Sequence, residues 1–263
     1  MNGLRIDRHG AHLHWTLERP DVRNALDDRL IAALREEALA AARDPSIAVI
    51  VIAGAGAAFC AGADLAWMRR MRDHDEARNM DDAMAVADMF HAVASLPMPV
   101  VARVHGAALG GGSGLLAIAD IVVAADDVQI GFTEARVGIL PATIAPYVVR
   151  RIGLAASRTL FLRAQRISAT EALRIGLVDE LCPADALDAT LQTVLDDLAR
   201  GAASAHRATK ALLARLAPLP DAAERALTAE AIARQRVSDD GQEGLRAFLE
   251  KRPPAWVRLP DRA

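Results

Sequence analysis

The spacing of hydrophobic and polar residues changes along this chain, and it predicts both strands and helices. Residues 47–56 form a continuous apolar run that ends at glycine, and residues 99–106 form a second such run. Runs of this kind are typical of strands that are buried on both faces. Residues 12–19 alternate instead, so we expect a half-buried strand with His12 and His14 on its solvent side.

Between these runs the apolar residues recur at helical spacing. A first helix is expected from residue 27 or 28 to residue 43, because Asp44-Pro45 stops it. Residues 65–96 predict a short helix, a mobile bridge near residues 72–78 and a longer helix that ends before Pro97.

After residue 120 the pattern returns to short strands, at residues 121–127 and 128–132. Thr133-Glu134 then begins a turn. Further on, the S-x-x-E capping box at residues 168–171 predicts the start of a helix, and Gly176 predicts its end.

From residue 183 onward the sequence is rich in Ala, Leu, Arg and Glu and predicts helices that are broken at Gly201, Pro218, Pro220 and Gly241. Alternating strands and helices followed by helices alone indicate an α/β protein. We expect an α/β core with the functional site at residues 1–200, and a helical C-terminal region at residues 201–263.

Two glycine-containing turns stand out because each follows a predicted buried strand. Residues 110–112 are three consecutive glycines that lead into an apolar segment typical of a buried helix, and residues 57–68 (AAFCAGADLAWM) follow the strand at 47–56. Asp64 can cap the helix after the second turn. The first amides of a helix have no partner within that helix, and glycine lets a ligand approach them, so such turns can hold a negative oxygen. The alternative is a pair of tight turns that bind nothing.

Composition and charge narrow the function further. The net charge of -3 gives no reason to expect a nucleic-acid partner, and no Lys/Arg block predicts binding to an anionic membrane. No apolar stretch reaches the roughly 18 residues of a membrane span, and the N-terminus lacks the apolar core of a signal peptide, so we expect a cytoplasmic protein. Cys60 and Cys182 lie far apart without ligand spacing, so neither a disulfide framework nor a metal site is predicted.

Five motifs in order carry a resemblance: AFCAGADL, HGAALGGGSGLLAIAD, FTEARVGILPA, ISATEALRIGLVDEL and FLEKRPP. Together they resemble the crotonase (enoyl-CoA hydratase/isomerase) superfamily over nearly the whole chain. The resemblance implies a core built as a spiral of ββα turns and a C-terminal region that forms a homotrimer, often paired to a hexamer. It also implies an acyl-CoA thioester substrate, of which coenzyme A is a part, and no separate cofactor.

Carried over to this chain, the resemblance places the catalytic groups at Ala63, Gly111 and Glu134. The amides of Ala63 and Gly111 would polarise the thioester carbonyl, and Glu134 would transfer protons. The best-known hydratases carry a further glutamate where this chain has Gly114. Hydration of an enoyl-CoA and isomerisation by Glu134 alone therefore both remain open, as does a non-catalytic acyl-CoA-binding role.

Several blocks, including PATIAPY, are similar to the bacterial 3-methylglutaconyl-CoA and isohexenylglutaconyl-CoA hydratases. Such a substrate has a distal carboxylate, for which Arg69, Arg70 and Arg136 are candidates. Tyr147 could reach substrate or belong to the core. The family's usual CoA-binding lysine falls on Ala66, so the CoA phosphates would be bound by other basic residues. The full set of predicted substrate contacts is Arg23, Ala25, Ala61, Asp64, Leu65, Gly110, Gly114, Arg136, Tyr147 and Lys251.

Overall fold

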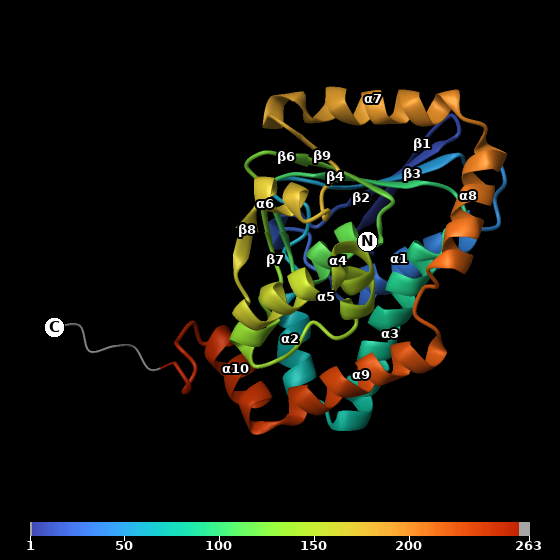
Figure 1. Cartoon of the computed structure of the whole chain (residues 1–263). Helices are drawn as coiled ribbons and strands as arrows, with labels where there is room; N and C mark the ends of the chain where they lie inside the picture. Colours follow the sequence, from blue (N-terminus) through green and yellow to red (C-terminus); the bar gives the residue numbers. More distant parts are fainter. Residues whose placement is uncertain (1, 258–263) are drawn as a thin grey trace.

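Two sheets of unequal size form the framework of the computed structural model, which describes residues 2–257 (Figure 1). The larger sheet has the strand order β1-β2-β3-β4-β6-β9, and all of its neighbours are parallel except β1 and β2. Its strands are β1 (Leu4–His9), β2 (His12–Leu17), β3 (Val49–Gly54), β4 (Val100–Val104), β6 (Ile121–Ala125) and β9 (Glu180–Cys182). The smaller sheet has the order β5-β7-β8, and its strands are β5 (Ala107–Leu109), β7 (Gln129–Gly131) and β8 (Arg166–Ser168).

Burial explains why these segments are strands. The central strands β3, β4 and β6 are buried at most positions on both faces, as their continuous apolar runs predicted. Along β2 every second residue is buried, and His12 and His14 are on the partly exposed face, as expected. The two strands predicted at 121–127 and 128–132 exist as β6 and β7, but they belong to different sheets.

The helices lie between and around the sheets. They are α1 (Asp28–Ala41), α2 (Leu65–Arg72), α3 (Glu76–Ala94), α4 (Gly111–Ile118), α5 (Ala145–Arg163) and α6 (Ala169–Arg174). The predicted short helix and longer helix are present as α2 and α3, but the connection between them is shorter than the bridge predicted near residues 72–78, since only residues 73–75 separate them. The Asp75 side chain accepts a hydrogen bond from the Arg78 amide and so starts α3 early.

The C-terminal helices border the rest of the molecule along three sides in the view of Figure 1. They are α7 (Leu187–Arg200), α8 (Ala203–Leu216), α9 (Ala222–Val237) and α10 (Asp239–Leu249). Helix α9 packs on α3, and α10 packs on α2 and on the short 3-10 helix η2 (Glu134–Val137). The predicted α/β class and the helical C-terminal region are therefore confirmed. None of the helices within residues 2–257 is long and apolar enough to cross a membrane.

Candidate active site

The two glycine-containing turns lie side by side because the loop after β3 pairs with β5. The Cys60 amide donates to the Ala107 carbonyl and the Leu109 amide to the Cys60 carbonyl, each at 3.0 Å. This approach requires glycine at position 112, where a Cβ would lie 2.3 Å from the Cys60 carbonyl oxygen. The backbone thus brings Ala63 and Gly111 to one place although they are far apart in the sequence.

Both predicted donors, Ala63 and Gly111, line a single cavity of about 160 Å³. Gly110 precedes α4 with φ of 51°, a conformation that favours glycine, and Gly111 is the first helical residue. Neither the Ala63 nor the Gly111 amide donates to an acceptor among residues 2–257. The remaining wall is mostly apolar, and its large side chains include Leu26, Ile31, Trp67, Met68, Phe90 and Ile144. An acyl chain fits such a lining.

Glu134, at the start of η2, is the one acidic residue among the described residues that line this cavity. Its carboxylate lies beside the Gly110 turn, since a Cβ built on Gly110 would be 3.1 Å from Glu134 Oε1. The residue as a whole is half-buried, but Oε2 is shielded from solvent and has no hydrogen-bond partner within the described chain. Burial raises the pKa of Glu134 from 4.5 to about 7. The carboxyl group can therefore give and take a proton near neutral pH.

The turn that carries Glu134 is held from behind by α9 and α10. A Cβ on Gly138 would lie 2.2 Å from the Asp240 carbonyl oxygen, and one on Gly244 would lie 2.4 Å from the Val137 carbonyl oxygen. Two glycines thus let α10 touch the backbone of the turn. In addition, Gln235 Nε2 donates to the Gly138 carbonyl at 2.8 Å. The C-terminal helices therefore position the candidate acid.

Gly114 lies behind the cavity wall rather than in it. Its position is fully buried in α4, and a Cβ there would lie 2.5 Å from Ile144 Cγ2 and 3.0 Å from Phe90 Cζ. The two apolar side chains fill the space that a side chain at position 114 would need. The structure therefore offers no room for a second acid where the well-known hydratases carry one.

Among the other predicted contacts, Ala61 and Gly110 line the cavity, whereas Arg23, Ala25, Asp64 and Leu65 do not. Leu65 is about half exposed, at 48%. The Arg23 carbonyl accepts from the Ala61 amide at 2.9 Å and so holds the donor loop.

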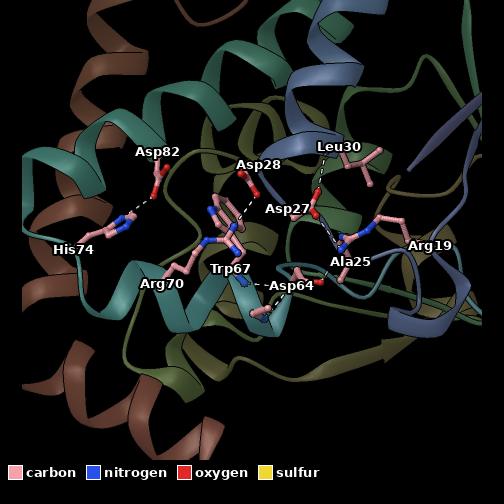
Figure 2. Close-up of polar contacts among 11 residues, drawn as sticks. Arg19, Ala25, Asp27, Asp28, Leu30, Asp64, Trp67, Arg70, His74 and Asp82 are labelled. Atoms are coloured by element: carbon pink, nitrogen blue, oxygen red, sulfur yellow. Dashed lines mark hydrogen bonds and ion pairs between the residues drawn. The ribbon is translucent and has the colours of Figure 1, made fainter. Parts of the chain in front are cut away.

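Figure 2 shows the contacts that Arg19 makes with residues of the two loops before α1 and α2. Its Nη2 lies 2.9 Å from Asp27 Oδ2 and 3.0 Å from Asp64 Oδ2, and Nη1 donates to the Ala25 carbonyl. Asp64 also caps α2, as expected, by accepting from the amides of Ala66 and Trp67. In this structure Ala25 and Asp64 support the cavity from outside.

Arg136, Tyr147 and Lys251 lie away from the cavity lining as well. Arg136 and Lys251 are exposed. Tyr147 is buried 6.2 Å from Phe90, measured between ring centroids, and its hydroxyl has no partner among residues 2–257. The arginines proposed for a distal carboxylate are likewise at the surface, where Arg70 pairs with Asp28 (Figure 2).

The sequence reasoning missed Arg236, a buried arginine that does line the cavity. A signal was present. Along α9, Ala229, Ile232 and Ala233 form the buried stripe, and Arg236 continues it at helical spacing. The signal was a charged residue at a position of α9 where the spacing predicts an apolar one.

Comparison with known proteins agrees with this geometry. The family profile described as Enoyl-CoA hydratase/isomerase matches residues 9–258. The 2,3-dehydroadipyl-CoA hydratase of Escherichia coli (strain K12) is 33% identical over 256 residues, or 97% of this chain and 98% of that protein.

Solved structures agree as well. Pseudomonas aeruginosa AtuE is 39% identical with a TM-score of 0.79, covering 97% of this chain and 100% of that one. An enoyl-CoA hydratase from Mycobacterium avium subsp. paratuberculosis K-10 has a TM-score of 0.84 at 27% identity, covering 97% and 99% of the two chains. The chain therefore belongs to the enoyl-CoA hydratase/isomerase (crotonase) family.

Proposed function

We propose that this protein is an enoyl-CoA hydratase that adds water across the double bond of an α,β-unsaturated acyl-CoA. The observation that carries the proposal is the position of the Glu134 carboxylate against the Gly110 turn, in the same cavity as the amides of Ala63 and Gly111. An apolar cavity with two donors and one acid of raised pKa is what polarisation of a thioester and proton transfer require.

In the proposed reaction, the thioester oxygen accepts hydrogen bonds from the two amides. Ionised Glu134 removes a proton from water as the water oxygen attacks the β-carbon, and the electron pair of the double bond moves to the thioester oxygen as an enolate. Neutral Glu134 then returns the proton to the α-carbon. One water is consumed and the carboxylate is regenerated. Each amide donor of this type is worth about 10² to 10³ in rate.

Isomerisation is the second candidate, because one carboxylate can also carry a proton from one carbon to another. We favour hydration because the 33%-identical Escherichia coli relative is named as a hydratase. The name of that relative and the sequence resemblance support two kinds of acyl group, 2,3-dehydroadipyl and the branched 3-methylglutaconyl group. A non-catalytic acyl-CoA-binding role is the third candidate, and the buried Glu134 argues against it.

We further propose a homotrimer or a hexamer. Helix α8 has no buried residue in the single chain, and Leu212, Leu213 and Leu216 on it are 55–73% exposed. A second copy of the chain would cover such a surface. Light scattering should give at least about three times the 28.0 kDa of one chain, and a mass of 28.0 kDa would contradict the proposal.

The test of the activity is incubation with a panel of enoyl-CoA thioesters that includes 3-methylglutaconyl-CoA, with products identified by mass. Hydration adds the mass of one water, and we expect this product. A product of unchanged mass with a displaced double bond would establish isomerisation instead. Binding of the thioesters without any product would support the non-catalytic role.

A further inference from the structure

One charged side chain in the cavity wall has no part in the proposed reaction. Arg236, in the last turn of α9, is 5% exposed and lines the same cavity as Glu134. Its Nη1 makes a single long contact of 3.5 Å with the Asn79 carbonyl oxygen, and its buried Nε has no partner within residues 2–257. No carboxylate oxygen of the described residues lies within 4.0 Å of a guanidinium nitrogen of Arg236, so the side chain forms no ion pair with them.

Two other shielded arginines, Arg19 and Arg151, differ in this respect. Arg19 pairs with two carboxylates, and Arg151 lies 2.5 Å from Asp179. A buried charge without a partner is costly, and proteins ordinarily supply one. Burial lowers the pKa of Arg236 to about 10, so the side chain still carries its charge at neutral pH. Within residues 2–257 this charge therefore has no carboxylate at ion-pair distance.

The described residues around Arg236 do not replace the missing ion-pair partner. The opposite charge that acts on it is Asp82 on α3, whose carboxylate is 3.2 Å from His74 Nδ1 (Figure 2). The backbone around Arg236 is fixed, because its carbonyl accepts from Gln242 Nε2 at 2.8 Å. Two other residues of the cavity wall, Ile232 and Val86, are apolar. An anion that enters the cavity would therefore meet a guanidinium held in place and available to it.

We infer that Arg236 binds a carboxylate at the far end of the acyl chain, so that the cavity selects ω-carboxyacyl thioesters over acyl chains that end in a methyl group. The inference rests on the proposed function for the position of the thioester at the other end of the chain. A guanidinium fork binds a carboxylate through charge-assisted hydrogen bonds in a water-poor site. Methyl-ended chains would leave the fork unpaired, which disfavours them.

The experiment compares pairs of saturated thioesters that differ only at the last carbon: glutaryl- with pentanoyl-CoA, adipoyl- with hexanoyl-CoA, and pimeloyl- with heptanoyl-CoA. Calorimetric titration of the wild-type protein should show that at least one acid binds about 10- to 100-fold more tightly than its methyl-ended partner. Arg236→Met should abolish that preference, and Arg236→Lys should retain part of it. Arg234→Met is the matched control, because Arg234 is on the same helix and its side chain is 67% exposed, and it should keep the preference.

Equal affinities within all three pairs for the wild-type protein would overturn the inference, and so would a preference that persists in Arg236→Met. The wild-type comparison and Arg236→Lys give the answer even where the methionine variant does not fold. Saturated thioesters cannot be hydrated, so this experiment is independent of turnover. A carboxylate preference without any hydration of the unsaturated analogues would support Arg236 as the binding residue while refuting the proposed activity.

Discussion

The two sides of the cavity are built in opposite ways. On the donor side, residues 61–63 and 110–111, the functional groups are backbone amides in short turns that glycine makes possible. On the helical side, formed by α9 and α10, the functional group is the Arg236 side chain, which tertiary packing brings to the cavity. Glu134 lies between them, next to the donor turn and supported by the helices. The comparison teaches that each donor turn can be recognised from its local sequence, although the two turns meet only through the pairing of Cys60 with β5, whereas Arg236 reaches the cavity through the packing of α9.

Among the changes made on the two sides of the cavity, the largest effect is expected from removing one donor. Gly111→Pro deletes the amide hydrogen at the first position of α4, a position that proline tolerates. Turnover should fall about 10² to 10³-fold. Gly111→Ala is the control, because it adds a Cβ near the flexible end of Leu26 but keeps the amide. Steady-state kinetics should separate the two variants, and equal activity would remove Gly111 from the donor pair.

This prediction depends on the donor turns, which could be predicted from the sequence for physical reasons. Turns with consecutive glycines and an apolar strand before them are visible in the sequence, and the family resemblance added Glu134. The filling of the space at Gly114 by Ile144 and Phe90 was not visible, because those residues come from α3 and from the segment before α5. Arg69, Arg70 and Arg136 were proposed for the distal carboxylate because they lie close to the motifs in the sequence. Arg236 belongs to α9, 100 residues after Arg136. The helical spacing of α9 marks Arg236 as buried, but long-range packing decides which cavity it lines, and a local pattern does not show that.

The second effect concerns the free energy of burying Glu134. The folded-state pKa of about 7 lies above the ordinary 4.5, so the folded protein loses stability relative to the unfolded chain as the pH rises from 4.5 through 7. At one pKa unit per about 1.4 kcal/mol, the ionised group costs up to about 3 kcal/mol above pH 7. Glu134→Gln should therefore gain stability over the wild type in urea unfolding at pH 9, and less at pH 5. A stability difference that does not change with pH would contradict the buried carboxylate.

The third effect tests the filled space behind the donor side. Gly114→Ala should destabilise the protein by about 1–3 kcal/mol, as overpacking of a core does. Gly114→Glu should fail to provide a second catalytic acid, since even the Cβ lies 2.5 Å from Ile144 Cγ2. Thermal unfolding of Gly114→Ala alone and in an Ile144→Ala background measures the coupling. If the alanine at 114 costs as much without the Ile144 side chain, the space is not filled as described.

The smallest effect concerns the link between the two sides. Gln235→Leu removes the hydrogen bond from α9 to the Gly138 carbonyl beside the Glu134 turn and should cost about 1 kcal/mol in unfolding free energy. Gln192→Leu is the control, because its exposed hydrogen bond to Asp196 lies on α7. Equal stability of the two variants in urea unfolding would show that α9 does not support the turn through this contact.

The central claim is that Glu134 alone transfers the protons. It is tested most directly by the pH dependence of kcat/KM for hydration of an enoyl-CoA, measured for the wild type and for Glu134→Gln. The ionised carboxylate accepts the first proton, so wild-type kcat/KM should rise with pH and reach half of its plateau near pH 7, the pKa that burial gives Glu134. Glu134→Gln should bind the thioester, lose the inflection and turn over about 10² to 10⁴-fold more slowly. A Glu134→Gln variant with wild-type activity and the same inflection would contradict the claim.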